Sequence, residues 1–185
     1  MKVLISGFLP FGTHTENSSQ IIAEKFKSLQ LNGFEFQVVI LPVTFCSAFE
    51  RLKDEIHSFK PDVVICMGLA SNRKTICLEK VAVNFMHSKG ADNEGVVKNH
   101  EVILPKAPAA YFSTLPLEAM LEIEASFPVK LSLSAGSFVC NETMFRLLDY
   151  LKDGQVQSGF IHLPSLKEDE GRIFETVINL LQALK

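Results

Sequence analysis

The apolar run Val63-Val64-Ile65-Cys66-Met67 lies just after Pro61 and is the stretch that decides the fold class. Five consecutive apolar residues without polar alternation are typical of a strand that is buried on both faces of a sheet. Residues 45–59, before this run, carry apolar side chains at helical spacing, and Pro61 ends the helix that they predict. A buried strand that follows a helix is typical of a largely parallel sheet, so the run favours an α/β fold.

The same alternation of apolar runs and amphipathic segments continues on both sides of this strand. Further strands are predicted over residues 2–6, 34–41, 75–84 (as a pair), 129–133 and 159–163. Further helices are predicted over residues 21–29, 116–125, 138–151 and 172–184. A polar loop at 89–110 is long enough to be functional. We therefore predict a single α/β domain over residues 1–185, a three-layer sandwich whose largely parallel or mixed twisted sheet is flanked by helices.

Composition and charge narrow the functional class. Of the 185 residues, 47% are apolar and 21% are charged, which is too apolar for a disordered chain. The 18 basic and 21 acidic residues give a net charge of −3, so we expect neither nucleic-acid nor membrane partners. The first apolar run stops at Ser6-Gly7, which is too short for a signal peptide. Four scattered cysteines without a CxxC pair then predict reduced thiols in the cytoplasm.

Three reactive side chains occur in or beside segments expected to meet at one edge of the sheet: Glu79, Cys140 and His162. Ligands of open α/β sheets bind where the strands end. Cys140 follows a glycine turn near the start of a predicted helix, whose dipole and free amides are expected to lower the thiol pKa. His162 would accept the thiol proton and later protonate a leaving amine, while Glu79 would orient the imidazole. The spacing alone leaves both a catalytic and a structural cysteine open.

The remaining candidate groups favour structural roles. The other three thiols, Cys46, Cys66 and Cys77, are expected to be small buried core residues. No HExxH or similar spacing is present, so no metal site is expected. Gly7 and Gly12 are spaced as in a phosphate-binding loop, but the Lys-Ser/Thr pair that such a loop requires is missing. Nucleotide binding is therefore not expected.

Six segments carry a recognisable pattern in a fixed order along most of the chain. They are Gly7-Phe8-Leu9-Pro10-Phe11-Gly12, Leu78-Glu79-Lys80-Val81-Ala82-Val83-Asn84, Asp92-Asn93-Glu94-Gly95, Ala109-Ala110-Tyr111-Phe112-Ser113-Thr114-Leu115-Pro116, Ser134-Ala135-Gly136-Ser137-Phe138-Val139-Cys140-Asn141 and Gly159-Phe160-Ile161-His162-Leu163-Pro164. Together they resemble the pyroglutamyl-peptidase I, or pyrrolidone-carboxyl peptidase, family of cytoplasmic cysteine exopeptidases. The segments around Cys140 and His162 are the specific ones.

The resemblance implies an activity and the residues that carry it. It implies that Cys140 is the nucleophile, His162 the general base and acid, and Glu79 the third member of a triad that hydrolyses the amide bond after an N-terminal pyroglutamyl residue of a peptide. It implies no cofactor, a cytoplasmic enzyme, and a homodimer or homotetramer. It also implies a pocket for the flat lactam ring, formed by Phe8, Phe11, Leu69, Phe138 and Val139.

The chain departs from the family pattern near this implied pocket. Lys89 stands where the family usually has an Arg that helps to stabilise the oxyanion, so Lys89 is the oxyanion candidate, with the charge but without the planar fork. Gly90 replaces a bulky apolar residue, Leu69 a frequent Gln and Leu133 an Asn, and the tail after residue 164 is shorter than usual. Two alternatives stay open: a cysteine-dependent amidase for another small acyl or lactam amide, and a catalytically silent pyroglutamyl-binding module.

Overall fold

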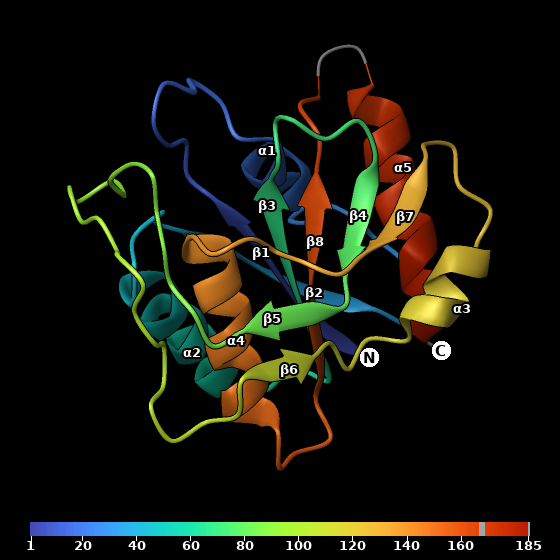
Figure 1. The fold of residues 1–185 in the computed structure, drawn as a ribbon. Coiled ribbons are helices and arrows are strands. Elements are labelled where there is room, and N and C mark those ends of the chain that lie inside the picture. Colours follow the sequence, from blue (N-terminus) through green and yellow to red (C-terminus); the bar gives the residue numbers. More distant parts are fainter. Residues whose placement is uncertain (167–168, 185) are drawn as a thin grey trace.

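The structure, a computed structural model, describes residues 1–166 and 169–184. Within these residues, six strands form a central sheet in the order β2-β1-β3-β8-β4-β7 (Figure 1). Their bounds are β1 Lys2–Phe8, β2 Glu35–Leu41, β3 Val63–Leu69, β4 Ile76–Glu79, β7 Val129–Ser132 and β8 Gln157–Leu163. Neighbouring strands are parallel except for β4 and β8, which run antiparallel. The sheet is therefore mixed and mostly parallel, as predicted.

Helices cover both faces of this sheet and complete a three-layer sandwich (Figure 1). Helices α1 (Ser18–Lys25), α3 (Leu117–Glu122) and α5 (Glu170–Leu180), with the short 3₁₀ helix η1 (Leu181–Leu184), pack on one face. Helices α2 (Ser47–Phe59) and α4 (Val139–Leu151) pack on the other. No helix among the described residues is long and apolar enough to cross a bilayer.

Strand β3 shows why an unbroken apolar run suits this position. Val63, Ile65 and Met67 join the core beneath α1 and α5, whereas Val64 and Cys66 join the core beneath α2 and α4. Every residue of β3 is buried. Because alternate side chains of a strand point to opposite faces, a strand covered by helices on both sides needs an apolar residue at each position.

The stretch predicted as a strand pair divides into two elements of different sheets. Strand β4 ends at Glu79, and β5 (Val81–Val83) pairs with β6 (Ala110–Phe112) in a separate antiparallel ladder. The long connection between β5 and β6 carries only an isolated bridge between Met86 and Glu101. This connection, predicted as a loop, lies beside the start of α4 and forms one wall of the site described next.

Candidate active site

The Cys140 thiol and the His162 imidazole lie beside the same residue, Gly68 of β3. Gly68 and His162 are register partners in the parallel pair β3–β8. Helix α4 begins at Val139 and brings Cys140 to this point. A short distance shows this: a Cβ atom placed on Gly68 would lie 3.0 Å from the Cys140 sulfur. Gly68 of β3, Cys140 of α4 and His162 of β8 are far apart in the chain but therefore meet at one place on the sheet.

Gly68 is required here by space rather than by backbone conformation. The same Cβ atom would lie 2.8 Å from Cζ of the Phe160 ring and 2.9 Å from its Cε1. Contacts this short are essentially never made by a real Cβ atom, so any side chain would displace the ring or the thiol. The missing side chain at Gly68 leaves room for the Cys140 sulfur over β3.

Glu79 and His162 form a buried pair on neighbouring strands. The Nδ1 atom of His162 lies 2.7 Å from Oε1 of Glu79, and the two side chains are 6% and 0% exposed. In the antiparallel register of β4 and β8, Glu79 lies opposite Phe160, so Glu79 and His162 are diagonal neighbours. Since this contact occupies Nδ1, the Nε2 atom is the ring nitrogen left to exchange a proton with another group.

The Glu79 carboxyl is held in its ionised form. Burial by itself would raise its pKa. The hydrogen bond and charge of His162, the Ser132 hydrogen bond and, least, the charge of Arg73 together outweigh burial, so the pKa lies below the ordinary value of a glutamate. An ionised carboxylate next to Nδ1 orients the imidazole and stabilises its charged form.

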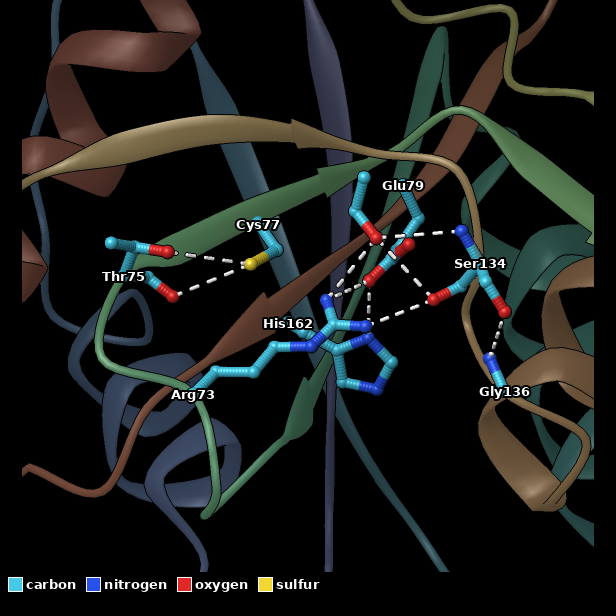
Figure 2. Close-up of polar contacts among 8 residues, drawn as sticks. Arg73, Thr75, Cys77, Glu79, Ser134, Gly136 and His162 are labelled. Carbon is cyan, nitrogen blue, oxygen red and sulfur yellow. Dashed lines mark hydrogen bonds and ion pairs between the residues drawn. The ribbon is translucent and has the colours of Figure 1, made fainter.

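Arg73, in the connection between β3 and β4, is a residue of this site that the sequence did not reveal. Its Nη1 atom donates to Glu79 Oε1 at 2.5 Å, and its Nη2 atom donates to the carbonyl oxygen of Ser134 at 2.9 Å (Figure 2). A lone arginine in a turn carries no motif or periodicity. A signal appears only once the sheet is assembled and the arginine faces a buried carboxylate.

The Cys140 thiol differs from the expectation in the direction of its pKa. Burial raises this pKa to about 12, and the negative charge of Glu79 and the neighbouring Cys66 thiol add to the effect. The charge of Arg73 and a backbone hydrogen bond act in the opposite direction but are weaker. The prediction that the helix start lowers the thiol pKa was therefore wrong, because loss of solvent around the sulfur outweighs the amides and dipole of α4.

An aromatic-walled cavity of about 420 Å³ opens beside the start of α4. The rings of Phe11 and Phe138 stand 6.3 Å apart between centroids, and both line this cavity together with Lys89 and Gly90. Lys89 is exposed, and a Cβ atom on Gly90 would meet nothing within 4 Å. The structure thus places Phe11, Phe138 and Lys89 around one cavity, and their part in substrate binding and catalysis stays a prediction.

The other three residues expected in the pocket do not line this cavity. Phe8 and Val139 are 2% and 0% exposed, in the core beneath α2 and α4. Leu69, next to Gly68, is 8% exposed and borders a second cavity, of about 350 Å³, that is also lined by Ser18 and Ser165. Their part in substrate binding remains a prediction.

Comparison with known proteins decides the family. A family model described as pyroglutamyl peptidase matches residues 1–175. The chain belongs to the pyroglutamyl peptidase family. The pyrrolidone-carboxylate peptidase of Halalkalibacterium halodurans is 38% identical over 171 residues, 90% of this chain and 85% of that one. The one of Brachyspira hyodysenteriae is 40% identical over 174 residues, 91% of this chain and 85% of that one.

Solved structures of this family share the fold. The crystal structure of pyroglutamyl peptidase I from Bacillus amyloliquefaciens superposes with a TM-score of 0.93 at 29% identity, over 98% of this chain and 93% of that one. The pyrrolidone carboxyl peptidase of Pyrococcus furiosus has a TM-score of 0.93 at 33% identity, over 100% and 98% of the two chains.

Two motifs that carried the resemblance to pyroglutamyl peptidases have structural roles in this chain. The buried Asp92 carboxylate accepts hydrogen bonds from the backbone N–H groups of Phe45, Glu94 and Val96 at 2.9–3.0 Å. It thereby anchors the loop that carries Lys89. Asn141, directly after Cys140, exchanges two hydrogen bonds of 2.9 Å with the backbone of Val83, which fixes the first turn of α4 against β5.

The remaining cysteines only partly follow the expectation. Cys66 and Cys77 are buried, as predicted, but Cys46 is exposed, so the prediction for Cys46 was wrong. Cys46 precedes α2 with a φ of 65°, and its N–H donates to the Glu142 carboxylate, so its backbone rather than its side chain is held by the core. Among the described residues, no cluster of three or more His, Cys, Asp or Glu side chains is arranged to hold a metal ion.

Proposed function

We propose that the protein hydrolyses the amide bond after an N-terminal pyroglutamyl residue, with Cys140 as nucleophile, His162 as general base and acid, and Glu79 as the residue that orients His162. The observation that carries this proposal is the buried contact between His162 Nδ1 and Glu79 Oε1, with the Cys140 sulfur beside the register partner of that histidine. Membership of the pyroglutamyl peptidase family supports the substrate class.

In the acylation step, His162 Nε2 takes the proton from the Cys140 sulfur as that sulfur attacks the pyroglutamyl carbonyl carbon. The carbonyl oxygen of the tetrahedral intermediate then carries the negative charge. The C–N bond breaks when the leaving amine receives the proton from His162, which leaves a pyroglutamyl thioester on Cys140. In deacylation, His162 deprotonates a water molecule that attacks the thioester, and the sulfur leaves with the proton, releasing pyroglutamate.

The raised pKa of Cys140 explains why a base must act together with the thiol. Burial raises the pKa of this thiol to about 12, so the thiol is almost entirely protonated at neutral pH. A thiolate therefore forms mainly through proton transfer to His162, and Glu79 stabilises the imidazolium that results. The buried Glu79 carboxylate thus supplies the negative charge that favours proton transfer from Cys140 to His162.

The cavity beside α4 suits the acyl group of this substrate. Pyroglutamate is a small, flat and neutral lactam, and the rings of Phe11 and Phe138 offer apolar faces to its methylene groups. Lys89 lines the same cavity and is the candidate to stabilise the oxyanion. Peptides with an N-terminal pyroglutamyl residue are the proposed substrates.

One observation favours a second candidate activity on the same machinery. A Cβ atom on Gly90 would meet nothing within 4 Å, so the cavity is open beside this residue. A cysteine-dependent amidase that acts on a bulkier acyl or lactam amide would make use of that space. The two activities differ only in the acyl group that is accepted.

A matched series of fluorogenic amides tests both activities. We expect release of the fluorophore from the pyroglutamyl amide, no release from the prolyl amide, which lacks the lactam carbonyl, and no release by the Cys140→Ser variant. Cys46→Ser, at the exposed thiol, should keep full activity. Faster hydrolysis of a six-membered lactam amide would support the second candidate. No hydrolysis of any amide would refute both.

A further inference from the structure

Arg73 joins three parts of the site through one guanidinium group (Figure 2). Besides its bonds to Glu79 and to the Ser134 carbonyl, Nη1 makes a longer contact of 3.4 Å with Ser132 Oγ. Ser132 ends the edge strand β7, and Ser134 opens the turn that leads into α4 and Cys140. The carboxylate on β4 and the turn before the thiol are therefore tied to a single side chain, which is 23% exposed.

The bonds of Glu79 are concentrated on one oxygen atom. Oε1 accepts from both His162 and Arg73, whereas Oε2 is buried and has no hydrogen-bond partner among the described residues. Without Arg73, this carboxylate would keep its hydrogen bond with the imidazole and its contact with the Ser132 hydroxyl but would lose its one cationic arginine partner. A fixed arginine fork restricts the orientation of such a carboxylate.

We propose that Arg73 is a positioning residue of the triad: it holds the Glu79 carboxylate against His162 and fixes the turn before Cys140. This inference rests on the function proposed above, because a position for Glu79 matters to catalysis only if His162 exchanges protons with Cys140. Arg73 touches neither the thiol nor a reacting atom, so it acts through Glu79 and the turn.

The charge of Arg73 also bears on the proton affinity of His162. The titratable and charged groups around this imidazole are Glu79 and Cys77 on β4, Cys140 on α4, Cys66 on β3, and Arg73. Of these, Glu79 favours the imidazolium and Arg73 opposes it. Arg73 therefore offsets part of the Glu79 charge that acts on the imidazole. Removing that charge should make His162 protonate at a higher pH.

Arg172 of α5 offers a matched control. Like Arg73, it pairs with a carboxylate, Asp169 at 2.8 Å, and donates to a backbone carbonyl, that of Ser126. It lies on the other face of the sheet from Cys140. Arg172→Met therefore removes an arginine with the same kinds of partner and should change neither His162 nor turnover.

NMR titration of His162 tests the electrostatic part without any need for activity. In the Cys140→Ser background, Arg73→Met should raise the pH of the His162 titration midpoint by about one pH unit. Arg73→Lys keeps the charge and should leave the midpoint near that of the parent, as should Arg172→Met. An unmoved midpoint in Arg73→Met would overturn the proposal, whether or not activity is lost, since a merely structural residue could also reduce activity.

Kinetics on the pyroglutamyl amide test the positioning part. Arg73→Met should lower kcat about a hundredfold with little change in KM, because a displaced triad affects the transition state more than binding. Arg73→Lys should retain the parent pH profile at reduced kcat, since one ammonium cannot reach Glu79 and Ser134 together. Added guanidinium ion should restore part of the activity of Arg73→Ala. Parental kcat in Arg73→Met would overturn the proposal, whereas an inactive parent enzyme would instead refute the proposed function.

Discussion

At the scale of single residues, the site depends on a missing side chain, that of Gly68, as well as on its reactive side chains. Gly68 supplies the space in which the Cys140 sulfur lies, and burial raises the pKa of that thiol. In the proposed mechanism, Glu79 supplies the negative charge and His162 the base that such a thiol requires. The proposed mechanism therefore needs all three groups: His162 accepts the proton of the Cys140 thiol, and Glu79 stabilises the imidazolium that forms.

Substitution of Gly68 tests the space requirement. Gly68→Ala should destabilise the fold by about 1–3 kcal/mol, because the new methyl group would overlap the Phe160 ring, and it should also abolish turnover by displacing the thiol. Urea unfolding and steady-state kinetics check the two effects. Gly90→Ala is the control, since its Cβ atom would meet open space and should change stability little. Full activity in Gly68→Ala would contradict the placement of Cys140.

Alkylation of the thiol tests the coupling of Cys140 to His162. A thiol with a pKa of about 12 that has lost its base should react slowly with iodoacetamide at pH 7, and its rate should rise about tenfold per pH unit as pH increases toward that pKa. We therefore expect His162→Ala to slow labelling of Cys140 at pH 7 by at least about tenfold. The parent for this comparison is Cys46→Ser, which removes the exposed thiol, with labelling followed by mass spectrometry. Equal rates with and without the imidazole would show that His162 does not activate Cys140.

At the scale of secondary-structure elements, the site is set by how β4 and the loop after β5 join the sheet. Strand β4 runs antiparallel to β8, so Glu79 lies beside the interior of β8 and reaches His162 across the strands. The loop after β5, anchored by Asp92, brings Lys89 to the aromatic cavity.

The anchoring role of Asp92 is open to a direct test. Asp92→Ala leaves three backbone N–H groups without their acceptor, which should cost about 1–3 kcal/mol of unfolding free energy. It should also lower kcat/KM for the pyroglutamyl amide, because Lys89, the oxyanion candidate, and Gly90 move with this loop. Thermal unfolding and kinetics measure both effects, with Glu94→Ala, an exposed neighbour, as the control. Unchanged kcat/KM would separate this loop from the reaction.

At the scale of the whole molecule, much of the architecture could be predicted from local patterns. The unbroken apolar run of β3 and the helical stripe of α2 indicate a two-sided sheet, and the structure confirms it. The residue types in the segments around Glu79, Cys140 and His162 likewise indicated the family. Periodicity and motifs are properties of neighbouring residues, so the chain carries this information without being folded.

What only the tertiary structure decided are the properties that depend on distant residues. Glu79 and His162 are 83 positions apart, and the pairing of β4 with β8 brings their side chains together. Arg73 became part of the site in the same way, as a turn residue that faces a buried carboxylate. The exposure of Cys46 and the raised pKa of Cys140 follow from which atoms exclude water around each sulfur. Burial and charge are summed over the whole fold, and no local pattern of the sequence contains that sum.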